Sequence, residues 1–160
     1  MINRFPITPD GYKNMNNELQ QLKNVERPAV IAAIAEARAH GDLSENAEYA
    51  AAKEKQGFIE AKISDLESKV ARAEIIDSKD TQTDQIQFGA FVSLVDIESE
   101  KRVAYRIVGD YESDLSKGYI SIYSPLSQAL MSKREGDEVE VSTPKGIRYY
   151  EIIKVGYDKP

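Results

Sequence analysis

The chain has 160 residues, of which 41% are apolar and 30% charged, so it can fold as one large domain or two small ones. Its formal net charge of −6 argues against a protein held to nucleic acid by its own charge, and the lack of cysteine excludes disulfides and thiolate metal sites. No apolar run could span a bilayer, Met1–Thr8 does not resemble a signal peptide, and we therefore expect a cytoplasmic protein.

The first predicted helix begins after Thr8, which suits the N-cap, with Pro9 in the first turn and Asp10 at the positive end of the helix dipole. Apolar residues then recur at helical spacing, and the pattern resumes less regularly further on: Tyr12, Met15, Leu19 and Leu22, then Val30, Ala33, Ile34 and Ala37. Pro28 lies inside this pattern and predicts a kink or a local break in the helix.

The second predicted helix has a continuous heptad seam at Tyr49, Ala52, Gln56, Ile59, Ile63, Leu66, Val70 and Ala73. Between the helices, Gly41 can end the first helix in the left-handed conformation, and Asp42 or Ser44 can cap the second. So short a link predicts an antiparallel hairpin whose arms, each of about 30 residues, extend on the order of 45 Å.

The second half of the chain alternates apolar and polar residues, as strands do. Ser124-Pro125 predicts the start of a short helix that runs to Met131, because serine suits the N-cap and proline the first turn. The predicted strands are Phe88–Val95, Val103–Ile107, Ile120–Ile122, Glu138–Val141 and Tyr149–Val155. The sequence therefore predicts an α+β protein, with a coiled-coil hairpin over 1–76, a polar linker over 77–87 and a strand-rich globular domain over 88–160.

Acidic residues gather around the predicted turn of the hairpin: Glu36, Asp42, Glu45 and Glu48. Carboxylate oxygens suit magnesium, although two of them alone would make a poor isolated site. The spacing Asp42-x-x-Glu45 is also that of a capping box, in which both side chains satisfy backbone donors. The spacing alone leaves both interpretations open, and His40, near a helix C-terminus, is explained as a structural residue.

A long segment of the hairpin closely resembles the tip of the GreA/GreB family of bacterial transcript cleavage factors. It comprises Glu36-Ala37-Arg38-Ala39-His40-Gly41-Asp42-Leu43-Ser44-Glu45-Asn46-Ala47-Glu48-Tyr49, with Arg27-Pro28 before it and Ala51-Ala52-Lys53-Glu54 after it. The second half resembles the family too, in Phe88-Gly89-Ala90, Tyr105-Arg106-Ile107-Val108-Gly109, Ser124-Pro125, Gly136-Asp137-Glu138-Val139 and Thr143-Pro144-Lys145-Gly146. The resemblance covers essentially the whole chain, and the lack of a broad basic surface near the tip favours the GreA branch.

The resemblance implies that the C-terminal domain is an FKBP-like antiparallel β domain with a short helix. This domain would dock on the rim of the RNA polymerase secondary channel, with Ser124 and Pro125 at the contact. The hairpin would pass down the channel, where Asp42 and Glu45 help to hold a magnesium ion shared with the polymerase. Ser44 would be the neighbouring polar residue of the catalytic tip and Leu43 the apolar one.

The same resemblance implies that the chain is not itself an enzyme. The polymerase would hydrolyse backtracked RNA, release 3′ fragments and resume elongation, and the free chain would bind no magnesium tightly. Arg38 and Lys53 would contact the nascent RNA 3′ end, whereas by default they are solvated charges or ion pairs within the hairpin, worth roughly 0–1 kcal/mol. We expect a monomer with RNA polymerase as its partner and no membrane association.

Two other functions stay open at this point. An inhibitory relative would occupy the same channel without stimulating cleavage, although Asp42, Ser44 and Glu45 match the stimulatory pattern. A prolyl isomerase or chaperone would follow from the FKBP-like domain alone, but the chain has no tryptophan to line such a pocket.

The chain departs from the family at Ser127-Gln128, where small and basic residues are usual, and at Met131-Ser132-Lys133, where isoleucine-glycine-lysine is common.

Overall fold

The computed structural model describes residues 3–42 and 46–158, so Leu43, Ser44 and Glu45 of the predicted tip lie outside the described residues. The chain forms two compact units. The first is built mainly from Tyr12–Ala73, and the second combines Arg4–Gly11 with the chain from Glu74 onward. No helix in the described ranges is both long enough and apolar enough to cross a bilayer.

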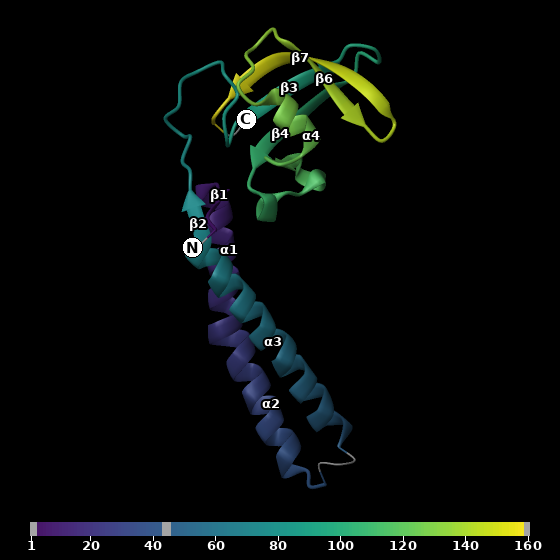
Figure 1. Ribbon diagram of the computed structural model, residues 1–160. Coiled ribbons are helices and arrows are strands. Elements are labelled where there is room, and N and C mark those ends of the chain that lie inside the picture. Colours follow the sequence, from purple (N-terminus) through teal and green to yellow (C-terminus); the bar gives the residue numbers. More distant parts are fainter. Residues whose placement is uncertain (1–2, 43–45, 159–160) are drawn as a thin grey trace. The chain divides into compact units, whose positions relative to one another are not determined.

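The first unit is a helical hairpin, in which α2 (Arg27–Ala39) and α3 (Ala47–Arg72) lie side by side (Figure 1). The first arm also contains α1 (Pro9–Gln21) and the π-helical turn η1 (Leu22–Glu26). All the predicted seam positions of α3 are buried or half-buried, which confirms its heptad pattern. On the first arm Val30, Ile34 and Ala37 are buried as expected, whereas Ala33 is exposed, so its place in the predicted seam is wrong.

The predicted break near Pro28 is confirmed, and it takes the form of the π-helical turn η1. The backbone N–H of Arg27 donates to the carbonyl of Leu22, five residues earlier, instead of to the residue four earlier. Because proline has no N–H to donate, a change of helical geometry beside Pro28 costs less than it would elsewhere in the arm. The first arm thus continues past Pro28 with one turn that is wider than an α-helical turn.

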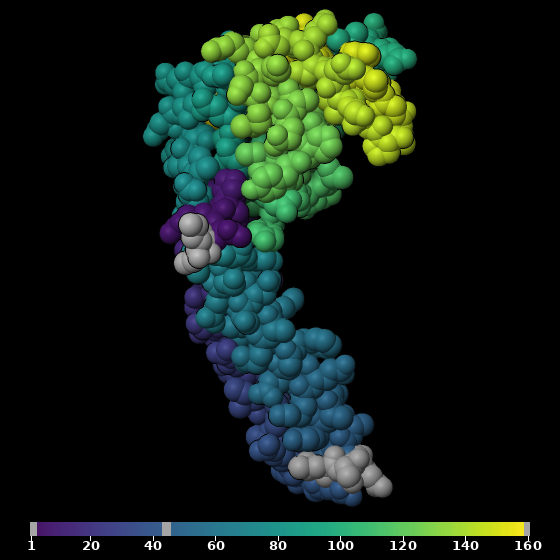
Figure 2. Space-filling view, viewed as in Figure 1, coloured from purple at the N-terminus to yellow at the C-terminus, as the bar shows by residue number. Residues whose placement is uncertain are grey.

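The second unit is a curled five-stranded sheet with one short helix, α4 (Pro125–Leu130). The strand order is β5-β4-β3-β7-β6, and the strands are β3 (Phe91–Asp96), β4 (Arg102–Val108), β5 (Tyr119–Ser121), β6 (Glu138–Thr143) and β7 (Gly146–Gly156). The β6–β7 hairpin extends past the rest of this unit (Figures 1 and 2). Two short 3-10 helices, η2 (Asp110–Glu112) and η3 (Leu115–Lys117), lie between β4 and β5.

The expected α+β fold, a helical hairpin plus a strand-rich domain with a short helix, is confirmed. One difference is that β5 pairs parallel to β4, so the sheet is mixed and not purely antiparallel. Another is that β3 begins at Phe91 and not at Phe88, because Gly89 adopts a positive φ of 87° in a turn before it. A further strand pair joins β1 (Phe5–Ile7) to β2 (Ala73–Ile75).

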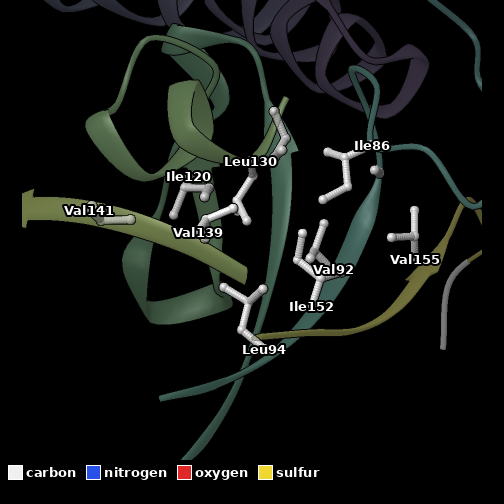
Figure 3. Packing of buried hydrophobic residues seen from close by; sticks show 11 residues of the cluster. Ile86, Val92, Leu94, Ile120, Leu130, Val139, Val141, Ile152 and Val155 are labelled. Atoms are coloured by element: carbon white, nitrogen blue, oxygen red, sulfur yellow. The ribbon is translucent and has the colours of Figure 1, made fainter. Parts of the chain in front are cut away.

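The core of the second unit lies between the concave face of the sheet and α4. Leu130 of α4 and Leu94 of β3 are fully buried, and Figure 3 shows the side chains of this cluster turned toward one another. The cluster comprises Ile86, Ala90, Val92, Leu94, Ile107, Ile120, Leu130, Val139, Val141, Ile152 and Val155. The alternating burial along β3 and β6 follows from the alternating pattern of the sequence, because successive side chains of a strand point to opposite faces.

Candidate functional site

The end of the hairpin is shaped by how α2 stops. His40 is the C-cap of α2, and its N–H donates to the carbonyl of Ala37 at 3.2 Å, while the N–H of Gly41 donates to the carbonyl of Arg38 at 3.3 Å. Gly41 follows with a φ of 108°, a left-handed conformation that glycine adopts without steric cost. The expected role of Gly41 in ending the first helix is therefore confirmed.

The start of α3 differs from the expectation. Its N-cap is Asn46, whose side-chain oxygen accepts from the N–H of Tyr49 at 3.0 Å. The amide group of Asn46 also donates to the carbonyl of Ala37 at 2.7 Å, which ties the ends of the two arms together. The prediction that Asp42 or Ser44 caps α3 is wrong, and the residue that does so was missed although asparagine is a preferred N-cap.

Asp42 lies before the N-cap of α3, and because Glu45 lies outside the described residues, the capping-box interpretation of the acidic pair stays a prediction. The Asp42 side chain is exposed at the turn, as are Glu36 on α2 and Glu48 in the first turn of α3. Within residues 3–42 and 46–158, no three acidic or imidazole side chains come together as metal ligands. The described part of the tip thus offers exposed carboxylate oxygens of the kind that magnesium prefers.

Arg38 and Lys53 lie exposed on opposite arms near the turn. The guanidinium carbon of Arg38 lies 5.9 Å from the centroid of the Tyr49 ring, and the Lys53 ammonium lies 3.4 Å from the side-chain oxygen of Gln56. Among the described residues, the ion pairs of the hairpin are Arg27–Glu60 and Lys69–Asp65. Both side chains are exposed, as the default interpretation of solvated charges expects, and neither forms an ion pair with another described residue.

Ser124 and Pro125, the predicted docking residues, lie at the start of α4. The Ser124 hydroxyl accepts from the N–H of Ser127 and lies 3.0 Å from the Ser127 hydroxyl, so its polar group is occupied by the helix cap. Pro125 is exposed, and so is the adjacent Tyr123 ring at 61%. Tyr123 was missed from the sequence, where its only signal is its position next to Ser124-Pro125.

Comparison with known proteins identifies the family. The profile "Transcription elongation factor, N-terminal" of GreA and GreB matches residues 5–75, and the profile "Transcription elongation factor, GreA/GreB, C-term" matches residues 81–157. Transcription elongation factor GreA of Phenylobacterium zucineum is 54% identical over 154 residues, which cover 96% of this chain and 98% of that protein. Its counterpart from Rickettsia prowazekii is 54% identical over 157 residues, covering 98% and 97%.

Two solved structures are also similar. GreA factor homolog 1 of Thermus thermophilus is 26% identical, with a TM-score of 0.44 and coverage of 96% of this chain and 99% of that one. The GreA/GreB factor from Nitrosomonas europaea is 21% identical, with a TM-score of 0.43 and coverage of 96% and 100%. From the two profile matches and the near full-length identity to curated relatives, the chain belongs to the GreA/GreB family of transcription elongation factors.

Proposed function

We propose that this chain enters the secondary channel of RNA polymerase and stimulates the polymerase's own cleavage of backtracked nascent RNA. The cleavage releases 3′ fragments and rescues arrested elongation complexes. The chain is not itself the enzyme on this proposal, because it lends side chains to an active site that belongs to the polymerase. It acts in the cytoplasm as a monomer, with the polymerase and the nascent RNA 3′ end as its partners.

The observation that carries the proposal is the exposed carboxylate at the turn of the hairpin. Asp42 lies in the turn before Asn46, the N-cap of α3, and its side chain is exposed there. The 26 residues of α3 correspond to a length of about 40 Å at 1.5 Å per residue. An arm of that length supports the delivery of an acidic turn into a deep channel.

Asp42 and Glu45 are the residues that would hold magnesium at the tip, together with ligands from the polymerase. One or two protein carboxylates suit this ion, which otherwise keeps waters or substrate phosphates. When bound there, the ion supplies an activated water and stabilises the leaving oxygen of the RNA. Ser44 would be the neighbouring polar residue of the tip, and Arg38 and Lys53, exposed on opposite arms, would hold the extruded RNA by its phosphates.

The C-terminal unit would dock on the polymerase through the start of α4. Because the Ser124 hydroxyl is occupied by the helix cap, its part in docking is to hold Pro125 and Tyr123 in place. Those two exposed side chains provide the apolar contact. A buried aromatic ring at the centre of an interface commonly carries much of the binding energy.

The test is cleavage of a backtracked elongation complex by the wild type and by the double variant Asp42→Ala/Glu45→Ala. We expect the double variant to bind polymerase normally and to lose cleavage by at least about a hundredfold, as for a positioned catalytic group. The control is Glu36→Ala/Glu48→Ala, which removes the same charge from exposed acids beside the turn. Undiminished cleavage by the Asp42/Glu45 variant would defeat the mechanism, and blocked elongation without shortened RNA from the wild type would favour an inhibitory relative.

A further inference from the structure

The outer face of the sheet, opposite the core, carries a row of large side chains within the second unit. In the strand register Arg106 of β4 lies beside Phe91 of β3 on one side and Tyr119 of β5 on the other. The Arg106 guanidinium carbon lies 4.7 Å from the centroid of the Phe91 ring and 5.8 Å from that of Tyr119. The cation is thus held between two aromatic rings that come from different strands.

Next to this row the sheet has small side chains. Ser93 of β3 lies between Ala104 of β4 and Lys154 of β7 in the register, and Gly156 lies beside Phe91. Because Ser93, Ala104 and Gly156 fill little space, the row of large side chains borders a hollow of about 600 Å³. Ligand pockets usually measure roughly 300–1,000 Å³, so the hollow is large enough for a small organic molecule.

The hollow is lined by more positive than negative side chains. Arg106, Lys117 and Lys154 line it, against Asp158 as the acidic residue of the lining. The Arg106 side chain is only 12% exposed, and its Nη1 lies 3.8 Å from Oδ2 of Asp10, too far for a hydrogen bond. Within the described part of the chain, Arg106 Nε is buried and has no hydrogen-bond acceptor. In a chain of net charge −6, such a local surplus of positive charge favours an anionic ligand.

The strand order argues against a peptide as that ligand. β3 and β4 form the floor of the hollow, and each is paired with a strand on both sides, so neither has a free edge to which a peptide strand could add. A ligand here must therefore be recognised by side chains. The rings of Phe91 and Tyr119 suit a flat aromatic ring, and the guanidinium of Arg106 and the two lysines suit phosphate groups.

We infer that this hollow is a nucleotide-binding site, at which Lys117, Lys154 and Arg106 hold the phosphates and the base lies against Phe91 and Tyr119. A smaller neighbouring cavity of about 270 Å³ shares Arg106 and Asp158 with the hollow and is also lined by Asp10, Asp77 and Lys79. Its acidic side chains outnumber its basic ones, so the phosphate groups are assigned to the hollow, where the two lysines lie. The site lies entirely within the second unit and does not depend on the function proposed for the hairpin.

The test is a titration of the full-length ¹⁵N-labelled chain with magnesium-free ATP, followed by NMR. We expect the largest amide shifts at Ser93, Ala104 and Lys154, and an affinity about tenfold weaker in Lys117→Gln/Lys154→Gln, because charge-assisted contacts are lost. The matched control, Lys133→Gln/Lys145→Gln, removes the same charge from exposed lysines outside the hollow. Arg106→Lys keeps the positive charge but loses the planar guanidinium with its several N–H donors. It should weaken ATP binding while leaving the fold intact.

Binding of three further ligands is compared with that of ATP: adenosine, inorganic triphosphate and a hexaglutamate peptide. Adenosine alone should bind more weakly than ATP, and so should inorganic triphosphate, because each supplies only half of the contacts. Triphosphate that binds as tightly as ATP would overturn the contact with the base. Equal weakening by the two lysine double variants, shifts confined to other parts of the chain, or a hexaglutamate peptide that binds as tightly as ATP would overturn the nucleotide site.

Discussion

Leu22 and Val30 belong to the same buried cluster with Ile59 and Ile63 of α3, although they are eight residues apart in the chain. A heptad seam would place the next buried residue at position 29, one residue earlier. The π-helical turn η1 takes up the extra residue, because its hydrogen bond from Arg27 to Leu22 spans five residues. Without it the last turns of α2 would be rotated by about 100°, which would turn Glu36 toward α3.

Removing the extra residue should therefore be tolerated. In a Pro28→Ala background, which restores the missing helix donor, deletion of Asn24 should convert η1 into α-helix and keep Val30, Ile34 and Ala37 buried. Deletion of Ser64, an equally exposed residue of α3, should break the seam between Ile63 and Leu66 and cost more than about 3 kcal/mol. Thermal unfolding followed by circular dichroism distinguishes the two, and equal losses for both deletions would contradict this account of η1.

The Arg27–Glu60 pair should give a pH-dependent contribution to hairpin stability. Nε and Nη2 of Arg27 donate to the two carboxylate oxygens of Glu60 at 2.7 and 2.8 Å, and this side-chain hydrogen bonding lowers the pKa of Glu60. Because the folded-state pKa is depressed, the stabilisation is complete above the ordinary glutamate pKa and is lost as the pH falls through the lowered one. A ¹³C NMR titration of the Glu60 carboxyl in the wild type and in Arg27→Gln measures the shift.

In Arg27→Gln the pKa of Glu60 should return toward its ordinary value. Arg38→Gln, which removes the same charge nearer the turn, should leave that pKa unchanged. An unaltered pKa of Glu60 in Arg27→Gln would show that the hydrogen bond is not its cause.

Ser132 stands in a conformation that suits glycine. Its φ is 70°, and it occupies the position at which the GreA/GreB pattern commonly has glycine. A left-handed conformation costs a residue with a Cβ roughly 1–2 kcal/mol, so Ser132→Gly should raise the free energy of unfolding by about 1 kcal/mol. Ser142→Gly, in the exposed face of β6, should lower it by a similar amount. Urea unfolding measures both, and a stability loss in Ser132→Gly would contradict the prediction.

Tyr123 should contribute to polymerase binding if the start of α4 is the docking surface. Tyr123→Ala removes a ring that is 61% exposed, so the isolated chain should keep its stability. Its affinity for polymerase should fall about tenfold or more, whereas cleavage at saturating factor should be unchanged. Tyr149→Ala is the matched control, because that ring is 49% exposed on the β6–β7 hairpin. Equal affinity of the two variants would place the docking contact elsewhere.

The sequence by itself determined the features that depend on local periodicity. The seam of α3 follows from the regular spacing of Ile59, Ile63, Leu66 and Val70, because one face of a helix is defined by residues three and four apart. The position of the turn at Gly41 follows in the same way, since a glycine after the last seam residue ends a helix. The roles of Asp42 and Glu45 stay predictions, and the cleavage experiment tests them.

Only the tertiary structure decided features that depend on contacts between distant parts of the chain. Asn46 caps α3 while its amide group bonds to Ala37 of the other arm, so the packing of the hairpin end selects it over Asp42. Arg106 meets Phe91 and Tyr119 through the register of three strands, one pair of them parallel. Periodicity specifies which face of an element is apolar, but strand register and the neighbours it creates depend on how elements far apart in the sequence pack together.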